Sequence, residues 1–190
     1  WEDADEVHAR HGKVIEDVGF SGTVADPVAE IDRRIAGWRF TAYHLRRGDI
    51  IDRPPWTHKT WPAKIEVDEL YKAHMHKAQG ELGIVFSDTR QSFDALARHV
   101  PSAKSVEAII DFSGLTGAQR DLLELYAMSR ADQIVAPSIS AFSSAAARIA
   151  GKERMTFRDV LDDEEIDVAY DALAERMASS LSEFPSTSDA

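Results

Sequence analysis

The sequence predicts an α/β domain, with a parallel sheet that carries helices on both faces. Two observations predict this fold class. Apolar runs of strand length alternate with longer segments in which apolar residues recur every three or four positions. Glycine or proline residues stand at most of the junctions, where they favour turns and helix ends. The 190 residues are enough for one compact domain with a sizeable core.

Strand and helix candidates follow one another along the chain. A helix is expected first, at residues 28–35, where Val28, Ile31 and Ile35 share a face. The expected strands are residues 38–45, 84–87, 108–112 and 133–136. The helices between and after them are expected at residues 67–78, 93–97, 117–131 and 140–149. Because each strand is followed by a helix, neighbouring strands are expected to run parallel.

The two ends of the chain differ from this central unit. Residues 1–37 are expected to be a lead-in segment or a remnant of an N-terminal domain, and residues 38–160 the α/β domain itself. Residues 161–184 form an acidic helix with an apolar stripe, and the polar tail 185–190 is expected to be disordered. Since the chain begins at Trp1, we expect it to be a fragment or a processed form.

Composition narrows the classes of function. The absence of cysteine excludes disulfides, thiolate metal sites and a cysteine nucleophile, and it favours a reducing, cytoplasmic location. The net charge of −11 argues against nucleic acid or an anionic membrane as partner. No apolar run approaches the ~20 residues of a membrane span. His8 and His11 lack acidic partners at suitable spacing, so no metal site is expected.

Polar residues that suit a nucleoside diphosphate follow the expected strands. Ligands of open α/β sheets bind beyond the carboxyl ends of the strands. Arginine matches phosphate oxygens with a fork of donors, and a serine-rich helix start offers hydroxyl and backbone N–H groups to an anion. The residues at these positions are His44, Arg46, Asp88, Ser138, Ser140, Phe142 and Ser143. Arg47 is expected on the opposite face of its strand from Arg46, because side chains alternate.

Two carboxylates are candidates for reading the base. Asp88 or Glu124 can accept from the N1–H and amino groups of guanine, a pair of donors that adenine lacks on that edge. Each residue also has a plainer interpretation. Arg46 can belong to a surface pair, the serines can be helix caps, Asp88 can be a turn residue and Glu124 can face water. Taken one residue at a time, these alternatives stay open.

Three motifs in order resemble one enzyme family. His44-Leu45-Arg46-Arg47-Gly48-Asp49 resembles the first motif of α1,2-, α1,6- and protein O-fucosyltransferases. Leu123-Glu124-Leu125-Tyr126-Ala127-Met128-Ser129 resembles the third, and Phe86-Ser87-Asp88-Thr89 is similar to the segment between them. The resemblance covers roughly residues 38–150.

The resemblance implies a GT-B enzyme with two Rossmann-like domains, of which this chain supplies the donor-binding half. Such an enzyme transfers fucose from GDP-fucose to a glycan or protein hydroxyl, with inversion and without a metal or other cofactor. Arg46 matches the arginine that binds the β-phosphate and assists departure of GDP, and His44 matches a neighbour that reaches the phosphates. Glu124 stands where the family has an aspartate near guanine. Ser140 matches a phosphate-binding serine of the final turn, and Phe142 and Ser143 match the aromatic and hydroxyl positions that follow it. Asp88 matches the retained acid of the middle motif.

Two departures from the family pattern leave other functions open. Glu124 is one methylene longer than the aspartate of the family, and Thr89 replaces an acid of the α1,6 branch. The alternatives are a GT-B enzyme that uses another nucleotide sugar and a non-catalytic nucleotide-binding α/β module. The acceptor is expected to bind an N-terminal domain of which residues 1–37 are at most a remnant.

Overall fold

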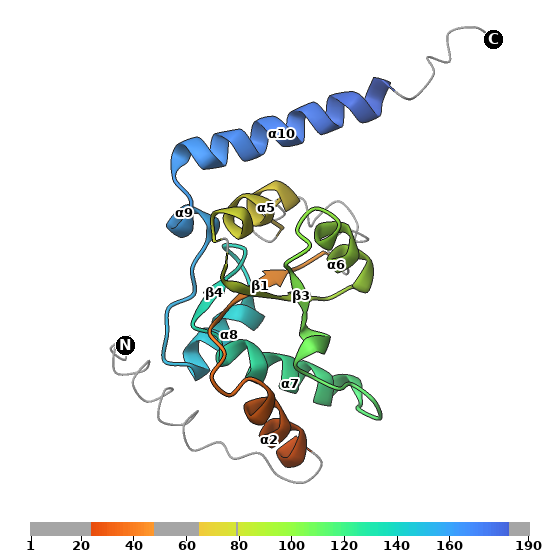
Figure 1. Cartoon of the computed structure of the whole chain (residues 1–190), viewed down its shortest axis with the longest axis vertical. Helices are drawn as coiled ribbons and strands as arrows, with labels where there is room; N and C mark the ends of the chain where they lie inside the picture. Colours follow the sequence, from red (N-terminus) through yellow and green to blue (C-terminus); the bar gives the residue numbers. More distant parts are fainter. Residues whose placement is uncertain (1–23, 48–64, 79, 183–190) are drawn as a thin grey trace, which may run out of the picture.

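A four-stranded sheet lies between two layers of helices (Figure 1). The computed structural model describes residues 24–47, 65–78 and 80–182, with side chains up to residue 175. All strand pairs are parallel and the order is β3-β2-β1-β4, which is the order of the first four strands of a Rossmann fold. The strands are β1 (Phe40–Leu45), β2 (Leu82–Ser87), β3 (Lys104–Ser105) and β4 (Gln133–Val135). The predicted α/β fold with a parallel sheet is confirmed.

Each face of the sheet has its own helices. One face packs against α2 (Ala25–Arg34), α7 (Gly117–Ser129) and α8 (Ala141–Ile149). The other packs against α5 (Asp68–Lys77), α6 (Arg90–Ala97) and α9 (Phe157–Val160). The long helix α10 (Asp163–Ser182) contacts α5 and runs past it (Figure 1). None of the helices in the described part of the chain combines the length and the apolar character of a membrane span.

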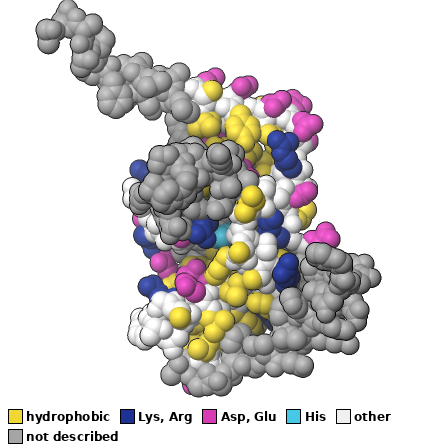
Figure 2. Space-filling model, turned by 180° about the vertical axis from the view of Figure 1, so that it is seen from behind, with side chains coloured by type: hydrophobic (Ala, Val, Ile, Leu, Met, Phe, Trp, Pro, Cys, Tyr) yellow, Lys and Arg dark blue, Asp and Glu magenta, His cyan; other side chains and the backbone are white. Residues whose placement is uncertain are grey.

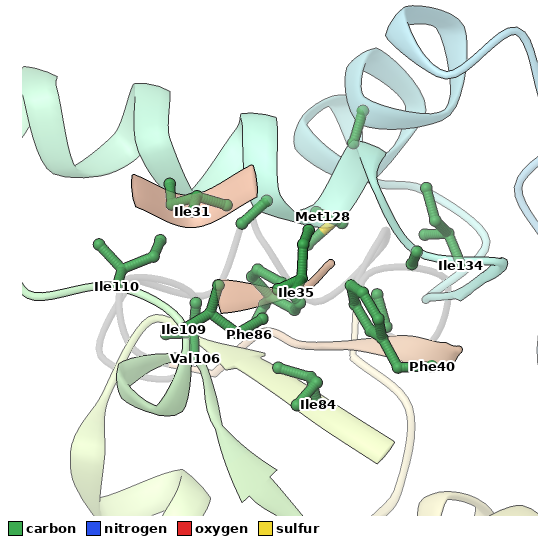
Figure 3. Close-up of a cluster of buried hydrophobic side chains, with 14 of the residues drawn as sticks. Ile31, Ile35, Phe40, Ile84, Phe86, Val106, Ile109, Ile110, Met128 and Ile134 are labelled. Carbon is green, nitrogen blue, oxygen red and sulfur yellow. The ribbon is translucent and has the colours of Figure 1, made fainter. Parts of the chain in front are cut away.

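Side chains of the central strand alternate between two hydrophobic cores. Phe40 and Ala42 of β1 point into the core beneath α2 and α7, whereas Tyr43 and Leu45 point into the core beneath α5. Figure 3 shows the first core, in which Ile31 and Ile35 from the start of the described chain lie against the side chains of the sheet. Since β1 is buried along its whole length, it holds a rigid position between β2 and β4.

The third predicted strand is wrong in position. Residues 108–112 do not pair with the sheet, and β3 is the two-residue strand before them. A 3-10 helix, η3 (Val106–Ala108), starts instead, with the Ser105 hydroxyl accepting from the Glu107 N–H. The N–H groups of Ile109 and Ile110 both donate to the Val106 carbonyl, so these residues enter the core from a turn. An apolar run of this length does not reveal which of the two structures it forms.

Part of what the sequence predicts falls outside the described residues. This holds for the polar tail 185–190, for most of the lead-in segment with His8 and His11, and for Gly48 and Asp49 of the first motif. Within the described residues, the predicted helices correspond to α2, α5, α6, α7, α8 and α10, with ends shifted by a few residues.

Gly83 of β2 is a site where added volume is expected to destabilise the fold. A Cβ atom there would lie 2.9 Å from the Met75 Cε atom and 3.2 Å from the Tyr43 ring. Met75 can shift, but the Tyr43 ring is held by a 2.9 Å hydrogen bond between its hydroxyl and His74 Nδ1. Gly83→Ala is therefore expected to lower the free energy of unfolding by about 1–3 kcal/mol, measured by denaturant titration.

The matched control is Gly117→Ala at the start of α7, where a Cβ atom would meet nothing within 4 Å. An equal loss of stability in both variants would show that steric contact at Gly83 is not the cause.

Candidate functional site

A cavity of about 520 Å³ opens beyond the carboxyl ends of β1 and β2. Its volume lies in the range of small-molecule sites. Five of the residues predicted for a nucleotide site line it: His44, Arg46, Asp88, Glu124 and Phe142. They follow β1 and β2 or lie on α7 and α8, so the fold joins positions up to 98 residues apart in sequence (44 to 142). On the face shown in Figure 2, basic and acidic side chains lie close together with hydrophobic side chains between them.

His44 is a buried, neutral imidazole at the end of β1. The residue is only 5% exposed, and its Nδ1 atom lies 2.9 Å from the Ser140 hydroxyl oxygen. The Phe142 ring packs beside it, with 5.5 Å between the ring centroids. Burial lowers the pKa of His44 to about 4, with further lowering by the charges of Arg46 and Arg154. His44 is therefore uncharged at neutral pH and acts through hydrogen bonds.

The side chains of the neighbouring Arg46 and Arg47 lie on opposite sides of the sheet. Arg46 lines the cavity, whereas the Arg47 guanidinium donates to the Asp68 carboxylate at 2.6 Å and lies 5.7 Å from the Tyr71 ring centroid. This confirms the expected alternation along the strand. Arg46 is thus the member of the pair that can reach a ligand in the cavity.

Asp88 connects the ends of the two central strands. Both of its carboxylate oxygens accept from the backbone N–H of Arg47, at 3.0 and 3.1 Å. The carboxylate is exposed and lines the cavity, but its hydrogen bonds to Arg47 fix the backbone at the point where Arg46 leaves the sheet. Asp88 therefore has a structural task besides the predicted contact with a base.

Glu124 is the most perturbed acid of the cavity. Burial is the largest cause that raises its pKa to about 7, and the nearby Asp121 adds to it. The charge of Arg120 lowers the pKa of Glu124, whereas the charges of Glu107 and Asp88 raise it by smaller amounts. Near neutral pH the carboxyl group is therefore divided between its protonated and ionised forms, and a ligand that brings hydrogen-bond donors favours the ionised form.

The serine-rich turn before α8 does not line the cavity with its hydroxyl groups. Ser138 is exposed elsewhere, and Ser140 and Ser143 are buried. Arg154 donates to the carbonyl of Pro137 and, at 2.8 Å, to that of Ser138, so it holds this turn. The Ser143 hydroxyl has no hydrogen-bond partner among the described residues. Of the four residues predicted here, only Phe142 reaches the cavity.

Sequence reasoning missed several lining residues, of which Arg120 is the most informative. Its guanidinium lies 4.6 Å from the centroid of the Phe112 ring, so the two form a cation–π pair on the cavity wall. The sequence carried a usable signal, because Arg120 and Asp121 precede Glu124 by four and three residues on α7. Residues at these spacings share a helix face.

Within the described ranges, no group of three or more His, Asp or Glu side chains is arranged to hold a metal ion. The cavity residues instead provide guanidinium, imidazole, carboxyl and aromatic groups. These groups suit a ligand that combines an anionic part with a planar polar ring.

Comparison with known proteins gives structural similarity at low sequence identity. POFUT1 in complex with GDP-fucose aligns with a TM-score of 0.43 and 15% identity, over 70% of this chain and 45% of that one. POFUT1 in complex with GDP aligns with a TM-score of 0.44 and 17% identity, over 77% of this chain and 50% of that one. The fucosyltransferase NodZ from Bradyrhizobium aligns with a TM-score of 0.41 and 14% identity, over 77% of this chain and 59% of that one. No protein-family model and no curated protein sequence matches the chain. The aligned part covers about half the length of these fucosyltransferases.

Proposed function

We propose that this chain binds the donor of an inverting glycosyltransferase, GDP-fucose, for transfer of fucose to a hydroxyl group of a glycan or protein. The observation that carries the proposal is the meeting of residues from all three fucosyltransferase-like motifs around one cavity. His44 and Arg46 come from the first motif, Asp88 from the second and Glu124 from the third. Topology brings His44, Arg46 and Asp88 to one edge of the sheet, and Glu124 joins them at the same cavity from α7.

The diphosphate is assigned to the end of the cavity at β1. There Arg46 offers a charged fork of donors, and His44 offers a neutral donor beside it. During transfer the acceptor oxygen bonds to the anomeric carbon as the bond from that carbon to the β-phosphate oxygen breaks. GDP leaves with the electron pair, and the acceptor proton passes to a base or to solvent. Donors already aimed at the β-phosphate stabilise the charge that develops there.

The base is assigned to the end of the cavity at α7. An ionised Glu124 accepts from the N1–H and the amino group of guanine, while the Arg120–Phe112 pair provides a flat surface beside it. Adenine and uracil do not offer this pair of adjacent donors. The proposal therefore includes a preference for guanine over other bases.

A thermal-shift panel of GDP, GDP-fucose, UDP and ADP tests the proposed function. A ligand that binds only the folded state stabilises it by about 2.7 kcal/mol when present at 100 times its Kd. GDP and GDP-fucose are expected to raise the melting temperature clearly more than UDP or ADP at the same concentration. Equal shifts with all four would remove the guanine assignment, and no shift with any of them would remove the nucleotide site.

A second measurement separates binding from transfer. Incubation with labelled GDP-fucose and candidate glycan or peptide acceptors reports whether these 190 residues also carry out the reaction. With an acceptor-binding half supplied elsewhere, we expect donor binding with little transfer, because the two reactants are not held together. Binding of GDP but not of GDP-fucose would instead favour a non-catalytic nucleotide-binding module.

A further inference from the structure

The hydrogen bonds of Ser140 determine which way it bonds to His44. Its hydroxyl oxygen accepts from the Ser143 N–H at 3.3 Å, as the N-cap of α8, and lies 2.9 Å from His44 Nδ1. Ser140 and His44 are only 7% and 5% exposed. A hydroxyl group has a single proton, and within the described residues Nδ1 is the acceptor available to it.

The opposite arrangement leaves a buried group unsatisfied. If Nδ1 carried the proton and donated to Ser140, the hydroxyl proton would point into a buried region where none of the described residues offers it an acceptor. Such unpaired groups are rare in folded proteins because they lose their hydrogen bonds to water. The hydroxyl of Ser140 therefore donates to Nδ1, and Nδ1 is the unprotonated nitrogen.

The other ring nitrogen then carries the proton. Burial and the charges of Arg46 and Arg154 lower the pKa of His44 to about 4, so the ring is neutral and has one proton to place. Nε2 makes no hydrogen bond to any of the described residues and is not among the buried polar atoms that lack a partner. Because Nδ1 faces Ser140 and His44 lines the cavity, the Nε2–H group is the donor of this ring that remains for a ligand in the cavity.

We infer that Ser140 is a positioning residue that holds His44 in the tautomer with its proton on Nε2, so that the ring presents an N–H donor to a phosphate oxygen in the cavity. This inference rests on the proposed function for the identity of the ligand. It gives Ser140 a different task from the direct phosphate contact that the sequence resemblance implies. The hydroxyl group acts on the ligand through His44, and the same hydroxyl fixes the first turn of α8.

Nitrogen-15 NMR of the imidazole in the ligand-free protein tests the tautomer directly. We expect the Nδ1 resonance of His44 in the position of an unprotonated nitrogen and the Nε2 resonance in that of an N–H nitrogen. In Ser140→Ala the two resonances should move toward each other, because neither tautomer is held. Ser140→Thr keeps a hydroxyl group and should restore the wild-type pattern. A protonated Nδ1 in the wild-type protein would overturn the inference, whatever the protein binds.

Titration with GDP measures the consequence for the ligand. Ser140→Ala is expected to weaken GDP binding about five-fold, the scale of one neutral hydrogen bond, and Ser140→Thr to restore it. The control is Ser144→Ala, which removes a hydroxyl that donates to the Ser140 carbonyl at 2.7 Å in the same turn but leaves the bond to His44 in place. This control should retain both the NMR pattern and the affinity.

The outcomes separate the inference from the proposed function. Equal loss of GDP affinity in Ser140→Ala and Ser144→Ala would reduce Ser140 to a helix cap and overturn the inference. Absence of GDP binding by the wild-type protein, with the expected NMR pattern, would overturn the proposed function and the phosphate contact while leaving the tautomer established.

Discussion

Replacing Arg46 with alanine is expected to weaken GDP binding roughly 10- to 150-fold, which corresponds to about 1.5–3 kcal/mol for a hydrogen bond to a charged group. Arg46 lines the cavity at the end of β1, where the diphosphate is assigned. If the chain also takes part in transfer, loss of a donor to the developing charge on the β-phosphate should lower the rate by about 10²–10³. Isothermal titration with GDP and a donor-hydrolysis assay measure the two effects.

Arg47→Ala is the matched control for this experiment. The Arg47 side chain pairs with Asp68 on the other face of the sheet, and the side chains of the pair are 11% and 23% exposed. Its backbone N–H, which donates to Asp88, is unaffected by the substitution. We expect the variant to lose folding stability but to keep most of its affinity for GDP below its melting temperature. A greater loss of affinity in Arg47→Ala than in Arg46→Ala would show that the arginines are assigned to the wrong roles.

GDP binding is also expected to weaken roughly 30-fold between about pH 8 and about pH 5.5. Burial and Asp121 raise the pKa of Glu124 to about 7, against the opposing charge of Arg120, with smaller contributions from Glu107 and Asp88. Guanine needs the ionised carboxylate, so below the pKa each tenfold rise in proton concentration opposes binding tenfold. Affinity should therefore be highest above pH 7 and fall steadily below it.

Glu124→Gln isolates this effect from protonation of the nucleotide. The terminal phosphate of GDP titrates in the same pH range, and its contribution is common to both proteins. The ratio of the two affinities therefore reports Glu124 alone. At pH 8 we expect the variant to bind GDP more weakly than wild type and to have a smaller ratio of GDP to ADP affinity. At pH 5.5 we expect the two proteins to have similar affinities for GDP. A ratio that does not change with pH would contradict the assignment of Glu124 to the base.

The parallel sheet could be predicted because its strands are short apolar runs separated by clear helix patterns. The run Ala108–Phe112 was misleading for a local reason: the Ser105 side chain starts a 3-10 turn, and Val106 accepts the N–H groups that a strand would have paired. A pattern of apolar residues records which side chains are buried, and Ile109 and Ile110 are buried. It does not record where their backbone hydrogen bonds go.

The candidate site could be predicted in part for a similar reason. His44, Arg46 and Asp88 directly follow strands, so the topology alone brings them to one edge of the sheet. Ser140 and Ser143 also follow a strand, yet their hydroxyl groups turn inward, where Ser140 meets a histidine 96 residues earlier. That direction depends on the packing of α8 against the rest of the fold, which local sequence does not encode.

The burial of Glu124 also creates a trade-off between stability and function. Its pKa in the folded state, about 7, lies above the 4.5 of an ordinary glutamate, so the folded protein binds more protons than the unfolded chain between about pH 4.5 and pH 7. The contribution of this group to stability is therefore present at the acidic end of that window and is lost as the pH rises through 7. The same rise in pH ionises Glu124, which is the form that accepts hydrogen bonds from guanine. Glu124 therefore contributes least to the stability of the ligand-free protein at the pH where the protein binds guanine best. A ligand that donates hydrogen bonds to the carboxylate removes this destabilisation.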